Sequence, residues 1–108
     1  MRFPYLILMV IGTTAIAVPQ LRAQEIGDLQ VGRTLAQQVC AQCHAVGTRD
    51  AASPNPLAPR FEAVAATPGM TATALNVFLH TSHRAMPNLI LTEEQSNGVI
   101  AYILSLKK

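Results

Sequence analysis

Basic residues are few in this chain of 108 amino acids, and they form no cluster larger than the Lys107-Lys108 pair. Lys and Arg number eight, and Arg2 and Arg22 lie in an expected leader segment, which leaves six basic residues against six Asp and Glu. A protein that binds a nucleic acid backbone needs grouped Lys and Arg side chains to neutralise phosphates. The composition therefore argues against a protein that binds nucleic acid through its phosphates.

Cysteine is equally scarce, because Cys40 and Cys43 are the only two in the sequence. A tetrahedral zinc site would have to add His44 together with His80 or His83, a combination without a recognisable ligand spacing. No β-rich alternating run precedes Cys40, so the βαβ context of a thioredoxin-like dithiol is missing. A redox dithiol, a structural disulfide and, last, zinc remain as alternatives to the interpretation given below.

Long apolar runs are also missing, with one short exception near the start of the chain. Arg2 precedes an apolar run over 5–18, and a small residue, Ala23, follows soon after Pro19. This layout is typical of a secretory signal peptide. The run has about 14 residues and is interrupted by glycine and threonine, whereas a membrane-spanning helix needs roughly 20.

We therefore predict a signal peptide over 1–23, cleaved after Ala23, with Ala17 as a second possible site, and one domain over 24–108. A retained membrane anchor is the alternative. After cleavage the protein is expected in the periplasm with no stable membrane anchor. No internal repeat, low-complexity tract or domain linker divides the remaining chain.

The stretch that carries chemistry is Cys40-Ala41-Gln42-Cys43-His44. Two thiols three positions apart, followed at once by an imidazole, fit covalent attachment of a c-type haem. The cysteines would form thioethers with the two vinyl groups, and His44 would be the proximal ligand of the iron. About 85 mature residues make a small core, so a covalent haem would also serve as a structural staple.

Hydrophobic periodicity and capping residues predict an all-α fold. Asp28 can cap a helix that runs to about Val39, and a capping box over 92–95 opens a last helix with an apolar stripe from Val99 to Leu106. A third helix is expected from Thr71 or Thr73 into His83. The segment 45–69 is rich in Pro, Gly, Asn and Ser, which predicts a long loop with one short helix around 60–66.

The second axial position of the iron has four candidates in the mature chain. Met86 is the preferred one, because it precedes Pro87 in a turn, where a fixed backbone can aim a thioether at a metal. Met70 also lies in a turn but is closer to His44 in sequence. The remaining alternatives are His80, His83 and an open position. Phe61, Leu57 and Val64 are expected to face the porphyrin or to serve as ordinary core residues.

These motifs together resemble a small class I cytochrome c of the bacterial monohaem type, from Gly32 to Leu106. The resemblance rests on Cys40-x-x-Cys43-His44, the 32–35 segment, Met86-Pro87, the 91–94 segment and the 101–106 segment. It implies one covalent haem c in a crevice, first and last helices that cross near Gly32 and Tyr102, and one-electron transfer between periplasmic partners.

The resemblance also implies roles for residues in the loop. A proline carbonyl usually accepts a hydrogen bond from the proximal imidazole, and Pro56 is the best match for that proline. Arg60 is expected either to reach a haem propionate or to face solvent. Because lysine occurs only at the C-terminus, we expect partner proteins to dock through mainly apolar contacts that include Ala41, Val46 and Leu89.

The sequence thus favours a non-enzymatic electron carrier with His44 and Met86 as axial ligands, which exchanges electrons with a redox protein such as a dehydrogenase or a terminal oxidase. A haem-based sensor or peroxidase-like protein with an open or labile sixth position is the first alternative. A haem subunit of a dehydrogenase complex is the second.

Overall fold

The computed structural model describes residues 27–81 and 85–108. The expected signal peptide, His83 and Arg84 lie outside these residues. Within them the chain forms α1 (Leu29–Gln38), η1 (Cys40–Gln42), α2 (Phe61–Ala66), α3 (Ala72–His80) and α4 (Glu93–Ser105). The all-helical prediction is confirmed, and no helix among the described residues is long and apolar enough to cross a membrane.

The ends of the helices follow from side chains that bind the free backbone N–H groups of a first turn. Asp28 accepts hydrogen bonds from the N–H groups of Gln30 and Val31 at the start of α1. At the start of α4, Thr92 and Gln95 form the predicted capping box, in which each side chain binds the other residue's backbone N–H. Both helix starts were therefore predictable from local sequence.

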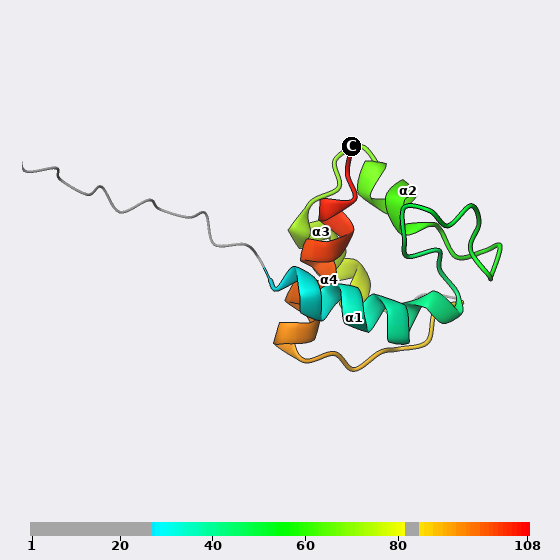
Figure 1. The fold of residues 1–108 in the computed structure, drawn as a ribbon. Helices are drawn as coiled ribbons and strands as arrows, with labels where there is room; N and C mark the ends of the chain where they lie inside the picture. The colour runs from blue at the N-terminus through cyan, green and yellow to red at the C-terminus, as the bar shows by residue number, and fades with distance from the viewer. Residues whose placement is uncertain (1–26, 82–84) are drawn as a thin grey trace, which may run out of the picture.

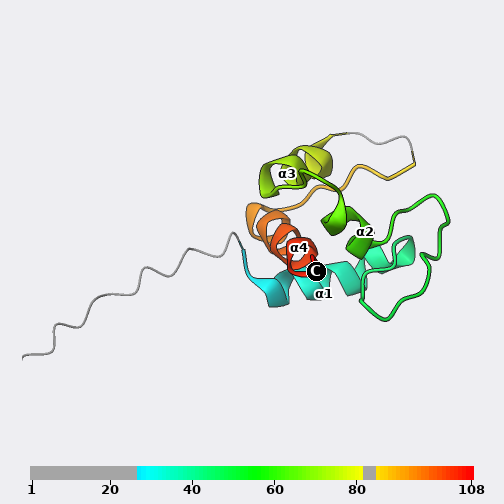
Figure 2. The ribbon, with the colours of Figure 1, turned by 90° about the horizontal axis from the view of Figure 1, so that it is seen from above.

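The first and last helices cross in close contact, as Figures 1 and 2 show. Gly32 of α1 lies against Gly98 of α4, and a Cβ placed on Gly32 would overlap the carbonyl group of Gly98. A Cβ on Gly98 would lie 3.0 Å from the oxygen of Asp28 and 3.0 Å from the nitrogen of Gly32. The prediction that the first and last helices cross near Gly32 is confirmed.

The buried face of α1 is made of small residues. Gly32 and Ala36, one helical turn apart, are the buried residues of this helix, and Ala36 is completely inaccessible. Val31 is half-buried and Val39 is exposed, so the apolar positions 31, 35 and 39 lie at the margin of the contact instead of its centre. Small residues occupy the centre of the contact because they let the two helix backbones approach closely.

The core lies between α4 and the other helices. Buried side chains of α4, among them Val99, Ile100 and Ile103, pack with Phe61 of α2 and Leu75 of α3. In Figure 2 the loop over 43–60 lies to the right of the core helices, and the loop over 85–92 starts on that side and runs back to α4. Residues of both loops line the cavity described below.

Helix α3 is shorter than expected. Thr71 caps it, as predicted, but the helix ends at His80, and the expected end at His83 lies outside the described residues. Thr81 has extended backbone dihedrals, and its side-chain hydroxyl donates to the carbonyl oxygen of Val77 at 2.6 Å. A threonine hydroxyl that binds the last turn competes with continuation of the helix.

Replacement of Gly32 by Ala tests the helix crossing. We expect Gly32→Ala to lower the free energy of unfolding by about 2 kcal/mol, because overpacking costs up to about 3 kcal/mol and alanine's better helix propensity returns about 1 kcal/mol. Gly98→Ala should lower the free energy of unfolding by less, because the added Cβ would lie farther from the neighbouring backbone atoms. Urea unfolding of the haem-loaded variants measures both values, with Gln37→Ala on the exposed face of α1 as the control. Equal stability of Gly32→Ala and wild type would contradict the close crossing.

Candidate functional site

The cysteines and His44 are brought together by the tight turn of η1. The carbonyl oxygen of Cys40 accepts hydrogen bonds from the N–H groups of Cys43 at 3.1 Å and His44 at 2.9 Å. This turn follows directly on the C-terminal end of α1, so the α1–α4 crossing fixes where it lies. Both thiols and the imidazole line the same cavity.

The ring of His44 is held in one orientation by the long loop. Its Nδ1 lies 2.7 Å from the carbonyl oxygen of Pro59, which can only accept, so Nδ1 carries the proton. The other nitrogen, Nε2, is therefore left with the lone pair that a metal ion requires. The ring of Phe61 packs beside the imidazole, with centroids 5.3 Å apart and planes inclined by 50°.

The proline that binds His44 differs from the one expected. Pro56 was the sequence-based choice, whereas the structure gives the hydrogen bond to Pro59. The run Pro54-Asn55-Pro56-Leu57-Ala58-Pro59 offers three prolines, and their order in sequence does not reveal which carbonyl the folded turn presents to the ring. Pro56 is exposed and is not among the residues that line the cavity.

Several bonds anchor the chain on either side of His44. The N–H of Ala45 donates to the hydroxyl of Ser53 at 2.9 Å, and the carbonyl of Ala45 accepts from the N–H of Phe61 at 2.9 Å. The buried hydroxyl of Tyr102 donates to the carbonyl oxygen of Val46 at 2.7 Å. Sequence analysis anticipated Tyr102 at the helix crossing but not this bond, which ties α4 to the segment that follows His44.

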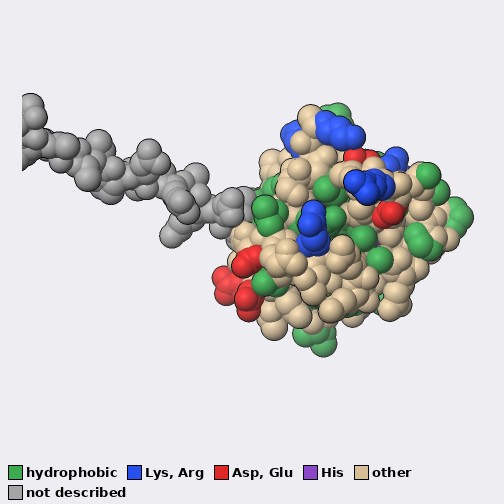
Figure 3. Space-filling model, viewed as in Figure 1, with side chains coloured by type: hydrophobic (Ala, Val, Ile, Leu, Met, Phe, Trp, Pro, Cys, Tyr) green, Lys and Arg blue, Asp and Glu red, His purple; other side chains and the backbone are tan. Residues whose placement is uncertain are grey.

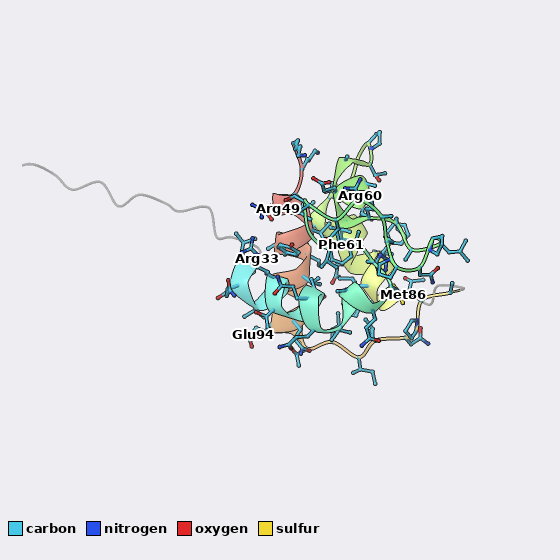
Figure 4. The ribbon with its side chains drawn as sticks, turned by 45° about the vertical axis from the view of Figure 1, so that its right-hand side comes forward. Arg33, Arg49, Arg60, Phe61, Met86 and Glu94 are labelled. Carbon is cyan, nitrogen blue, oxygen red and sulfur yellow. The ribbon has the colours of Figure 1, made fainter. Side chains whose placement is uncertain are left out.

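The cavity is largely apolar and has a volume of about 590 Å³, within the range of ligand sites in proteins. Its wall combines η1, the long loop, α2, α3, the 85–89 segment and α4. Leu57, Phe61 and Val64 line it, as predicted, and so do the methionines Met70 and Met86. In Figure 4, Phe61 lies in the interior and Met86 lies at the right-hand side, near the end of α1. The donor set and the apolar wall fit a porphyrin whose iron needs axial ligands.

Two other polar candidates lie away from this cavity. His80 lines a separate pocket with Asn76 and Glu93, and its Nδ1 lies 2.8 Å from the carbonyl oxygen of Asn76. Arg60 donates to Glu62 at 2.7 Å and does not line the cavity, although its Nε is buried without a partner. The propionate contact of Arg60 therefore stays a prediction.

The chemistry of the cysteines disfavours the alternatives to haem. Cys40 and Cys43 form no disulfide. Burial raises the pKa of the Cys40 thiol, whereas a redox-active dithiol needs a thiol whose pKa is lowered. Over 27–81 and 85–108, no three His, Cys, Asp or Glu residues are grouped so that they could hold a metal ion.

The prediction that Val46 belongs to the docking contact is wrong. Val46 is buried, with 6% of its surface exposed, and it belongs to the core. Its carbonyl is also bound by Tyr102, so Val46 cannot face a partner protein. Ala41 and Leu89 are half-buried. The alternation of small and apolar residues after His44 does not show which of them turn inward.

An all-helical domain with crossed terminal helices, in which Cys40, Cys43 and His44 line one apolar cavity, is the architecture of a cytochrome c with one covalent haem. The chain belongs to the family described as cytochrome C oxidase, cbb3-type, subunit III, whose model matches residues 27–103. This is a monohaem class I cytochrome c family, so the protein is a haem c electron carrier and not an enzyme. Searches of curated proteins and of solved structures gave no match.

Removal of the Tyr102 hydroxyl tests the bond that anchors the His44 segment. Tyr102→Phe leaves the buried Val46 carbonyl without its partner, so we expect the free energy of unfolding to fall by about 1–2 kcal/mol. Thr73→Val, which removes an exposed hydroxyl from α3 at nearly constant shape, should change it by less than about 0.5 kcal/mol. Denaturant unfolding compares the two, and an equal effect would show that the Tyr102 bond contributes nothing specific.

Proposed function

We propose that the protein carries single electrons on a haem whose iron is bound by His44 on one side and Met86 on the other. The observation that supports this most is that Cys40, Cys43, His44 and Met86, which come from two distant parts of the sequence, line one apolar cavity. The covalent thioethers would hold the macrocycle, and the Pro59 carbonyl would keep Nε2 of His44 available to the iron.

Met86 is favoured over the other candidates on two grounds. His80 lines a different pocket and uses Nδ1 on the Asn76 carbonyl. Met70 lines the cavity but also packs against the buried core, whereas Met86 has no place in that core cluster. Its position before Pro87, in a segment without helical constraints, leaves its thioether free to serve the metal.

This ligand pair determines what the protein would do. The haem supplies a one-electron couple, and a neutral thioether ligand raises its reduction potential relative to two histidines. If Met86 and His44 both bound the iron, no coordination position would remain for a substrate. The apolar wall formed by residues such as Phe61 and Val64 would keep water from a bound iron. An electron carrier needs these properties, whereas a sensor or peroxidase needs an open position.

The expected leader segment supports a proposal for the place of action. We propose that residues 1–23 direct export and are removed, so that the protein works in the periplasm. The intact mass of the exported protein shows whether these residues have been removed. The family description names an oxidase subunit, which makes a terminal oxidase the first candidate partner, with a dehydrogenase as the alternative. Co-purification of the tagged protein with either complex distinguishes the two.

Met86 and Met70 provide a matched pair of variants. We expect Met86→Leu to remove the weak long-wavelength band of sulfur-ligated ferric haem, to lower the reduction potential and to let carbon monoxide bind the ferrous form, because the thioether is lost and a position opens. Met70→Leu should keep the band and exclude carbon monoxide. Absorption spectra of the purified, haem-loaded variants measure each effect.

The opposite pattern, with the band lost only in Met70→Leu, would assign the ligand to Met70. Carbon monoxide binding to the wild-type ferrous protein would favour the sensor or enzyme hypothesis.

Docking is expected to depend little on charge. The face in Figure 3 carries Lys and Arg in small groups with Asp and Glu near them, and no broad basic field covers it. We therefore expect the rate of electron exchange with a purified partner to change by less than about threefold between about 0.02 and 0.2 M salt. Stopped-flow kinetics measures the rate, and a steep fall with salt would show that electrostatic steering dominates.

A further inference from the structure

Asn55 makes three hydrogen bonds in the loop that leads to Pro59. Its N–H donates to the carbonyl oxygen of Cys43 at 3.1 Å. Its side-chain Oδ1 accepts from the N–H of Leu57 at 3.0 Å, and its carbonyl oxygen accepts from the N–H of Ala58 at 3.0 Å. One half-buried residue thus connects the haem-binding motif to the turn that follows it.

These bonds use every backbone donor that the turn has. Pro56 and Pro59 have no N–H, so Leu57 and Ala58 carry the only backbone donors over 56–59, and both donate to Asn55. An asparagine side chain that binds the N–H two residues ahead forms an Asx-turn. The direction of the Pro59 carbonyl, 2.7 Å from Nδ1 of His44, therefore depends on Asn55.

We propose that Asn55 is a positioning residue that sets the reduction potential through His44. A strong bond from Nδ1–H to the Pro59 carbonyl raises the basicity of the imidazole and stabilises ferric iron. If the turn becomes less ordered, that bond weakens and the ferrous state becomes more stable relative to the ferric state. This inference rests on the proposed role of His44 as an axial ligand, and it does not depend on the identity of the second ligand.

The amide is better suited to this position than a carboxylate. Asn55 lines the cavity, and an ionised side chain there would favour ferric iron by its charge alone. Aspartate could form the same turn, but it would add that charge. Serine is neutral and can form the related turn through its hydroxyl, more weakly. Asn55→Ser is therefore the conservative variant. Asn55→Asp keeps the turn and adds a charge, so it separates the effect of turn geometry on the potential from the effect of charge.

The experiment uses the haem-loaded protein with Asn55→Ala, Asn55→Ser and Asn55→Asp. Asp50→Ala is the control, because Asp50 also binds a backbone N–H of this loop, that of Gly47 at 2.8 Å, but has no bond to the 55–59 turn. Two quantities are measured at high salt, which screens the charge removed at exposed Asp50 far more than a charge placed at half-buried position 55. They are the midpoint reduction potential and, by proton NMR, the solvent exchange rate of the His44 Nδ1 proton.

We expect Asn55→Ala to favour the ferrous state by about threefold to tenfold, tenfold being 59 mV for one electron, and to speed exchange of the His44 proton. Asn55→Ser should lie closer to wild type in both, and Asp50→Ala should match wild type. Asn55→Asp should lower the potential while the proton exchanges as slowly as in wild type. If Asn55→Ala does not fold, the Ser and Asp variants carry the same comparison.

An unchanged potential and unchanged proton exchange in Asn55→Ala, with only a lower unfolding midpoint, would show that Asn55 is merely structural. Failure of the ligand assignment is visible separately. If the wild-type spectrum lacks the sulfur-to-iron band, Met86 is not the ligand, yet the proton exchange still reports on Asn55 and His44. If no slowly exchanging His44 proton exists in wild type, the inference is overturned.

Discussion

The close crossing of α1 and α4 is the constraint on which the rest of the structure depends. Gly32 and Gly98 let the two backbones touch, and this contact fixes the end of α1 relative to the core. The turn of η1 follows that end, so the crossing also fixes the cysteines and His44. Because Val99 and Ile103 of α4 line the cavity, one helix contact positions both the attachment side and the floor of the haem site.

The loop that orients His44 is ordered by specific hydrogen bonds instead of by regular secondary structure. Val46 is the one residue over 43–60 that belongs to the core cluster, and Ser53, Asn55 and Pro59 each bind a group at or next to the haem-binding motif. A proline-rich segment loses less conformational entropy on folding, which lowers the cost of ordering it. The fold thus provides an oriented imidazole before any property of the iron is considered.

Local patterns predicted much of this structure, while contacts between distant segments were harder to predict. The helix caps at Asp28 and Thr92 and the crossing at Gly32 were predictable from sequence, because caps and small residues have direct hydrogen-bonding or steric causes. The choice of Pro59 over Pro56 depends on how a turn folds back in space, and so does the burial of Val46. Neither leaves a periodic signal in the sequence, although Asn55 before Pro56 was a recognisable turn signal.

The central claim is that Cys40 and Cys43 hold haem covalently in this cavity. The most direct test is acid-acetone extraction of the purified protein, after expression with the cytochrome maturation machinery, followed by an absorption spectrum of both phases. The account predicts that the haem stays with the precipitated protein, and that this retention is lost when both cysteines are replaced by alanine. Haem that moves into the acetone phase from the wild-type protein, or a protein that contains none, would contradict it.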